Sequence, residues 1–262
     1  MSRREVIRVC IPDSHGAHID WSSAKACAAD IKSLQPKEIV LLGDHLDCGG
    51  TFNSHQRSYT SEIAESYGDD IKSANTFLDM IQRAAPRADY HYLEGNHEWH
   101  VERWSANSFS DENDAASLLE VYGPQSVLEL KQRGIKYYKR SEFHMGVRSR
   151  GAIRLGKCFF VHGVSHARHA AAEHIRYFGG NVVFGHTHRV DSRIEPNVSS
   201  GAIGAWSFGT LAQLAPLYGH TRPTSWSHGY GIQFVRPNGI FTTISIPIVH
   251  GISLLPAALK SR

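Results

Sequence analysis

Residues 38–47 read EIVLLGDHLD. The apolar run 39–42 is typical of a strand that is buried on both faces of a parallel sheet, and Gly43 ends it. Two aspartates and a histidine follow at once. This pattern, a short apolar strand that ends in polar side chains, decides the predicted fold because it recurs along the chain.

Four further clusters of polar residues follow short apolar runs. They are Asp13-Ser14-His15 after residues 6–12, Gly95-Asn96-His97-Glu98 after residues 90–93, His162-Gly163 after residues 158–161, and Gly185-His186-Thr187-His188 after residues 182–184. In an open α/β sheet the carboxyl ends of neighbouring strands face one crevice, so we expect all five clusters to converge there. Carboxylate, imidazole and amide groups are ligands for divalent metals such as Mn, Fe and Zn. The clusters therefore predict a metal site.

Helical spacing separates the first strands. Apolar residues recur with the helical period over residues 21–34 and 70–85, so the order strand–helix–strand–helix–strand predicts parallel pairing through right-handed crossovers. Between residues 104 and 150 we expect one or two short helices and a strand near 135–138. A helix is expected over 166–178. The later part reads as strands and hairpins over residues 202–208, 230–235 and 240–249, with Pro237-Asn238-Gly239 as a turn. No repeat or linker is evident, which predicts a single domain over residues 1–262.

Composition indicates a soluble globular chain with an excess of histidine. Hydrophobic residues make up 41% of the 262 positions and charged residues 20%. The net charge of +3 permits an anionic substrate without requiring nucleic acid. The 17 histidines stand out, because histidine is the commonest metal ligand and the usual proton carrier near neutral pH.

Cysteine usage and the N-terminal sequence bear on the compartment. The four cysteines show no CxxC spacing, which argues against a disulfide framework or a structural zinc site and favours a reducing cytosol. No apolar stretch is long enough for a signal peptide or a membrane span. We therefore expect a cytoplasmic protein with no membrane partner.

The five clusters, taken in order, resemble a known family. The series Asp-x-His, Gly-Asp-x-x-Asp, Gly-Asn-His-Glu, His and Gly-His-x-His is similar to that of the calcineurin-like metallophosphoesterase superfamily, over residues 13–188. The resemblance implies two divalent metal ions as cofactors, with manganese as the first expectation and iron, zinc or nickel as alternatives. It also implies a four-layer α/β/β/α sandwich of two mixed sheets flanked by helices.

The resemblance implies a role for each cluster residue. Asp13, His15 and His188 would hold the first metal, and Asn96, His162 and His186 the second. Asp44 would bridge both metals. His97 would act beside them as a catalytic acid, and Asp47 would orient His97.

The implied reaction is the hydrolysis of a phosphodiester or phosphomonoester. A hydroxide that bridges the two metals would attack phosphorus, while His97 would protonate the leaving alkoxide. Nucleotides and oligonucleotides are among the expected substrates.

One position departs from a branch of this family. In the protein Ser/Thr phosphatases an arginine that clamps phosphate follows the second aspartate, but here the position is Cys48, which we expect to be a packed side chain. This counts against a protein phosphatase and leaves the clamp unassigned. The candidate substrate-binding residues are His45, Arg57, Arg103 and His166. Glu98 is expected to be a hydrogen-bond partner behind the ligands.

Two alternatives remain. Residues 209–214 and 226–231 look similar to a phage- and bacteria-borne branch whose members are described as phosphoesterases or DNA-repair exonucleases. A DNA exo- or endonuclease resembling the Mre11/SbcD branch, acting in phage or bacterial DNA metabolism, ranks second because the chain lacks a basic run. A non-catalytic binding scaffold ranks third, because such a descendant should have lost ligands that are all present here.

Overall fold

The computed structural model describes residues 5–48, 52, 66–199, 201–215 and 224–260. One sheet has the spatial order β12 (Ile252–Ser253), β11 (Phe241–Val249), β10 (Gly229–Val235), β1 (Val6–Ile11), β2 (Glu38–Leu41), β3 (Asp89–Leu93), β4 (Ile135–Tyr138). The other has the order β5 (Ala152–Leu155), β6 (Cys158–Val161), β7 (Asn181–Phe184), β9 (Gly201–Phe208), β8 (Val190–Asn197). The helices are η1 (Gly16–His18), α1 (Trp21–Leu34), α2 (Tyr67–Ala84), α3 (Asn96–Ser108), α4 (Glu112–Tyr122), α5 (Pro124–Val127), α6 (Ala170–Phe178) and α7 (Ala257–Lys260).

Both sheets mix parallel and antiparallel strands. β1 to β4 pair in parallel, with Cys10 opposite Val40, whereas β10 runs antiparallel to β1 and forms a hairpin with β11 across the predicted turn. In the second sheet β6, β7 and β9 are parallel, and β5 and β8 lie antiparallel at the edges. The predicted pair of mixed sheets is therefore confirmed.

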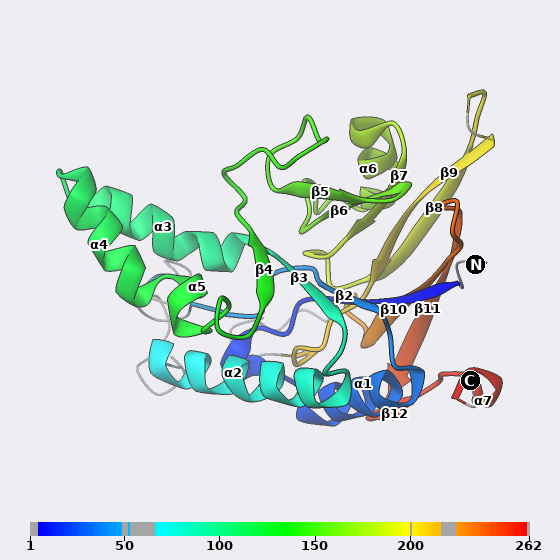
Figure 1. The fold of residues 1–262 in the computed structure, drawn as a ribbon, viewed down its shortest axis with the longest axis horizontal. Helices are drawn as coiled ribbons and strands as arrows, with labels where there is room; N and C mark the ends of the chain where they lie inside the picture. The colour runs from blue at the N-terminus through cyan, green and yellow to red at the C-terminus, as the bar shows by residue number, and fades with distance from the viewer. Residues whose placement is uncertain (1–4, 49–51, 53–65, 200, 216–223, 261–262) are drawn as a thin grey trace.

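Alternation along the strands creates four layers. Val9 and Ile11 of β1 face α1 and α2, where they pack with Ile31 and Phe77. The intervening Cys10 points to the other face and packs in the cluster that joins the two sheets. On the far side α6 covers the five-stranded sheet. The layers thus run helix, sheet, sheet, helix (Figure 1), as predicted.

The region between β3 and β5 differs from the prediction. α3 begins at Asn96, directly after β3, and continues into α4 and α5, which lie to one side of the sheets (Figure 1). The sequence predicted one or two short helices within residues 104–150. The polar Gly95-Asn96-His97-Glu98 cluster conceals this helix start, because it has no apolar residue with which to begin a helical period.

Two further elements also departed from expectation. α6 begins at Ala170 instead of residue 166, because its buried face starts only at Ala170 and Ala171 while His166 and His169 are exposed. β8 was not predicted at all. It is an edge strand with no consistently buried face and a proline at Pro196, so the sequence carries no strand period there.

None of the helices in the described residues could span a membrane, because none is both long enough and apolar enough to cross a bilayer.

Candidate metal centre

The predicted polar clusters lie at the carboxyl ends of five strands. The clusters after β1, β2 and β3 in one sheet meet those after β6 and β7 in the other. Three groups of side chains result, and in each the ligating atoms lie within 4.8 Å of one another. The groups are Asp13, His15 and His188; His15, Asp44 and His97; and Asp44, His162 and His186. These clustered carboxylates and imidazoles could hold metal ions.

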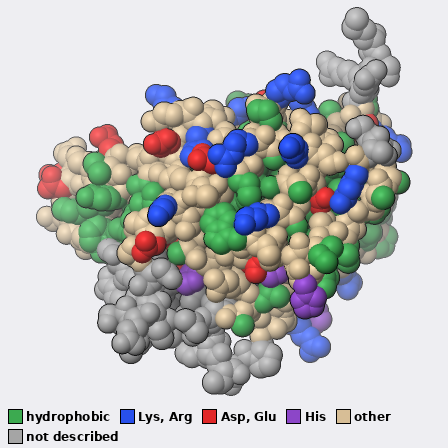
Figure 2. Space-filling model, turned by 90° about the horizontal axis from the view of Figure 1, so that it is seen from below, with side chains coloured by type: hydrophobic (Ala, Val, Ile, Leu, Met, Phe, Trp, Pro, Cys, Tyr) green, Lys and Arg blue, Asp and Glu red, His purple; other side chains and the backbone are tan. Residues whose placement is uncertain are grey.

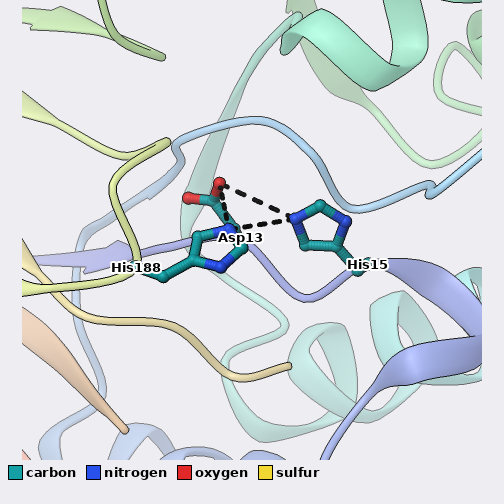
Figure 3. Close-up of side chains that lie close together, drawn as sticks. All are labelled: Asp13, His15 and His188. Atoms are coloured by element: carbon teal, nitrogen blue, oxygen red, sulfur yellow. Dashed lines mark hydrogen bonds and ion pairs between the residues drawn. The ribbon is translucent and has the colours of Figure 1, made fainter. Parts of the chain in front are cut away.

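The first group converges on one point (Figure 3). Nε2 of His188 lies 3.1 Å from Oδ2 of Asp13 and 3.0 Å from Nε2 of His15. Oδ2 of Asp13 is 4.0 Å from Nε2 of His15. All three side chains are buried, and Nδ1 of His188 has no hydrogen-bond partner among the described residues.

The second group is built around Asp44. Nε2 of His162 lies 3.1 Å from Oδ2 of Asp44 and 3.0 Å from the amide oxygen of Asn96. The rings of His162 and His186 are 5.1 Å apart between centroids. The structure therefore brings Asn96, His162 and His186 together with Asp44, as the resemblance implied.

Proton placement makes both groups suited to a cation. His15 donates from Nδ1 to Oδ1 of Asp47 over 2.7 Å, and His162 donates from Nδ1 to the carbonyl oxygen of Leu42 over 2.8 Å. Nε2 of each ring faces the oxygen or nitrogen atoms of its neighbours. A metal ion that replaced the Nε2 proton would find a lone pair there. Converging lone pairs on histidines whose second nitrogen is fixed by an oxygen acceptor are typical of metal sites, so the residues present fit divalent metals.

The electrostatics of the centre favour positive charge. Burial opposes ionisation of Asp13, but His188 and His162 outweigh it and hold the pKa of this carboxyl below its ordinary value. Burial likewise raises the pKa of Asp44, but His162 and His97 outweigh it and hold this pKa well below its ordinary value. Burial lowers the pKa of His162, but Asp44 and Asp13 raise it to about 9 overall. Burial and repulsion by His162 lower the pKa of His186 to about 4, so that its ring is neutral and able to ligate.

His97 and Asp47 lie side by side next to Asp44. Nδ1 of His97 donates to the backbone oxygen of Asp47 over 2.7 Å and lies 3.3 Å from its carboxylate. Nε2 of His97 faces Asp44 at 4.0 Å. Burial opposes protonation of His97, but Asp44 and Asp47 raise its pKa well above the ordinary value. The Asp47 carboxylate lies 2.7 Å from Nδ1 of His15 and 3.3 Å from Nδ1 of His97, so it contacts both rings.

Glu98 organises the loop that carries Asp44. Its carboxylate accepts hydrogen bonds from the backbone nitrogens of Asp44, His45 and Leu46 at 2.7–3.0 Å. It also accepts bonds from Tyr92 and from the backbone nitrogen of Gly95, the residue that caps α3. The expectation that Glu98 is a hydrogen-bond partner behind the ligands is confirmed.

The backbone at the centre is strained. His15, Asp44, His186 and His188 all have φ between 51° and 67°, in the left-handed region that residues other than glycine rarely adopt. Such conformations cost on the order of 1–3 kcal/mol each and persist where the surroundings impose them, most often at functional sites. Gly95 allows the strained residue Asp44 to pack closely against it, because a Cβ at position 95 would collide with the backbone nitrogen and carboxylate of Asp44.

The predicted substrate-binding residues fall into different places. His45 is fully buried, stacks on Phe77 and hydrogen-bonds to Ser14, and burial lowers its pKa to about 3. Its role in substrate binding stays a prediction. Arg57 lies outside the described residues. His166 is exposed, 6.0 Å from the ring of His186.

Two other predicted positions are Arg103 on α3 and Cys48 in the loop after β2. Arg103 is exposed on α3, over the ring of Trp99. Cys48 is buried, and burial raises the pKa of its thiol well above the ordinary value, which confirms a packed side chain.

Sequence reasoning missed Asp70. This residue of α2 accepts hydrogen bonds from the backbone nitrogens of Ala17, Asp47 and Cys48 over 2.6–2.9 Å, and so joins the loops after β1 and β2. An aspartate in the first turn of a helix is common, because it favours the helix dipole, so no sequence signal marks this one.

Comparison with known proteins finds likenesses among solved structures. No protein-family model matches the chain, and no curated protein matches it. Among solved structures, YfcE, a phosphoesterase from E. coli, is similar with a TM-score of 0.38 and 13% sequence identity, over 91% of this chain and 98% of that chain.

Proposed function

We propose that this chain is a dinuclear metal-dependent hydrolase of phosphoesters. The observation that carries the proposal is the position of Asp44, which lies within ligand distance of His162 and His186 and also within 4.8 Å of His15 in the neighbouring group. A carboxylate shared by two groups of ligands is suited to bridge two ions. The resemblance of the five ordered motifs to the calcineurin-like metallophosphoesterases supports the same assignment.

The proposed ligand sets follow the three-dimensional grouping. Asp13, His15 and His188 would hold one ion, and Asn96, His162 and His186 the other, with Asp44 between them. Manganese is the first choice, with iron, zinc and nickel as alternatives, because mixed carboxylate and imidazole sites accept all four. When bound, the two ions would lower the pKa of a water and neutralise charge on the phosphoryl oxygens.

The chain's own residues would position and protonate the substrate. His97 is held by the Asp47 backbone at Nδ1, which leaves its Nε2 proton directed toward the Asp44 side of the centre. From there it would donate a proton to the leaving oxygen. Asp47 would hold the positive charge of His97 and the orientation of His15.

A nuclease acting on long DNA is the less favoured reading. Such an enzyme needs many phosphate contacts from Lys and Arg. The chain has no basic run, and its net charge is only +3. On the face shown in Figure 2, Lys and Arg side chains lie among acidic and apolar ones without forming a continuous stripe. We therefore favour a compact substrate.

The test is Mn²⁺-dependent hydrolysis of an aryl phosphodiester and of the matching monoester, with the Asp44→Asn protein as control. We expect turnover of at least one compound that requires added metal and is lost in the variant. Turnover of the diester would assign a phosphodiesterase, and turnover of the monoester alone a phosphatase. Absence of both turnover and bound metal would refute the proposal.

A further inference from the structure

A cavity adjoins the metal centre on the side of His162. Its volume is about 200 Å³, and its lining includes His162, Gly163 and Val164 after β6, Glu94 after β3, and Arg140 and Arg150 from the chain between β4 and β5. His162 is the proposed ligand that the cavity and the centre share. His97, His15 and Asp44 are not among the lining residues. The cavity therefore lies beside the position of a reacting phosphoryl group and not over it.

Arg140 supplies an unpaired positive charge to this cavity. Among the described residues, none forms a hydrogen bond or ion pair with its guanidinium group, which lies 5.8 Å from the ring centre of Trp99. A cation–π contact with an aromatic ring attracts a guanidinium while its N–H donors remain available. A half-buried arginine with unused donors at a cavity wall is suited to bind an oxyanion, because a planar guanidinium matches phosphate geometry.

The backbone of Arg140 is fixed from two sides. Its backbone nitrogen donates to Oε2 of Glu94 over 2.6 Å, while Tyr137 donates to Oε1 of Glu94 over 2.7 Å. Both oxygens of Glu94 are thus engaged by groups other than the guanidinium. Gly151, at φ +66°, packs against the backbone of Arg140, where an added Cβ would lie 3.0 Å from its Cα. These contacts present the side chain in a defined position.

Arg150 is a weaker contributor. Its guanidinium already donates to the backbone oxygen of Ser141 over 3.2 Å and lies over the ring of Phe143. Arg140 is therefore the lining residue whose positive charge remains available to a bound ligand.

We propose that this cavity binds a second phosphate of the substrate, with Arg140 as its principal ligand. The proposal rests on the proposed hydrolase function and narrows it to phosphoesters that carry another phosphate near the one that is cleaved. A phosphate next to the scissile ester would extend past His162 into the cavity and complete the hydrogen bonds of Arg140.

The experiment compares two substrates that differ by one phosphate. Thymidine 5′-(p-nitrophenyl phosphate) is assayed with and without a 3′-phosphate, using the Mn²⁺-loaded protein. We expect kcat/KM to be about tenfold higher or more for the 3′-phosphorylated compound, mainly through KM, as for a charge-assisted hydrogen bond. In Arg140→Gln the ratio should fall to about one, and Arg140→Lys should restore part of it. Arg148→Gln, which removes an exposed arginine of the same segment that is not among the lining residues, should keep the wild-type ratio.

Binding provides a readout that does not depend on turnover. Calorimetry should show tighter binding of thymidine 3′,5′-bisphosphate than of thymidine 5′-monophosphate, and Arg140→Gln should remove the difference. Equal kcat/KM values for the two substrates, or a ratio that survives Arg140→Gln, would overturn the phosphate subsite while the hydrolase proposal stands. If neither compound is hydrolysed, the calorimetric comparison decides alone, and a bisphosphate that binds no tighter than the monophosphate overturns the subsite.

Discussion

Asp47 accepts a hydrogen bond of 2.7 Å from Nδ1 of His15. The opposite nitrogen of His15 faces Asp13 and His188, so the bond directs a proposed ligand toward its metal. A carboxylate behind a ligating imidazole fixes the tautomer and increases the basicity of the ligating nitrogen. Asp47 is thus tied to metal binding as well as to His97.

The first prediction concerns Asp47→Asn. The amide keeps an oxygen that can accept from His15 but removes the negative charge, so we expect the affinity for Mn²⁺ to fall by about 10–100-fold. Competition with a chromophoric chelator measures this affinity. Asp89→Asn, which alters an exposed ion pair with Lys37, is the matched control and should bind as the wild type does. Unchanged affinity in Asp47→Asn would show that His15 does not depend on this carboxylate.

The second prediction separates His97 from the metal ligands. His97→Ala should retain two metal ions but slow turnover by about 10²–10⁴-fold, because it removes a general acid. His100→Ala, one turn further along α3, is the control and should retain most activity. Metal content by mass spectrometry and kcat are measured together. Since His97 also groups with His15 and Asp44, loss of a metal ion in His97→Ala would instead make His97 a ligand.

Much of the fold and of the centre could be predicted from the sequence for one physical reason. Strands such as 39–42 are apolar on both faces because they lie between two layers, and the abrupt change to polar residues marks the end of each strand. Parallel strands bring those ends to one edge, so the five clusters could be expected to meet before any contact was known.

The features that the sequence did not predict depend on tertiary contacts. The acceptor for His162 is the backbone oxygen of Leu42, which no side-chain pattern reveals. β8 forms because it pairs with the neighbouring strand β9, and not because apolar and polar residues alternate along it. Arg140 lies two residues after the end of β4, and its place beside the β3 cluster follows from the parallel pairing of β3 and β4. That position was available to sequence reasoning, but a lone arginine in an exposed-looking segment gave no reason to select it.

The third prediction concerns Glu98→Gln. The carboxylate accepts five hydrogen bonds, three at Oε1 and two at Oε2. Glutamine in either orientation would turn an amide N–H₂ toward buried N–H or O–H donors, and each unsatisfied donor costs about 1–3 kcal/mol. We therefore expect the free energy of unfolding in urea to fall by roughly 3 kcal/mol. Glu102→Gln, a change on the same helix away from these donors, is the control. Equal stability of the Glu98→Gln and wild-type proteins would contradict this role.

The fourth prediction concerns the pH dependence of stability through His174. This buried residue of α6 stacks on Phe184, donates from Nδ1 to the backbone oxygen of Ala170 over 2.7 Å, and accepts at Nε2 from the backbone nitrogen of Val164 over 3.1 Å. Only the neutral ring can accept that bond. Burial accordingly lowers the pKa of His174 from its ordinary value of 6.5.

A lowered histidine pKa fixes the sign of the effect. The unfolded chain binds a proton at this residue more readily than the folded chain, so the contribution of His174 to stability is full above pH 6.5 and is lost as pH falls below it. His174→Gln lacks this titration and should be less stable than the wild type by about 1–2 kcal/mol at neutral or higher pH. Urea unfolding across a pH series should show the two stabilities converging as pH falls below 6.5. A difference that stays constant toward acid pH would mean that folding does not lower the pKa of His174. A difference that widens would mean that the folded protein protonates the ring more readily than the unfolded chain does.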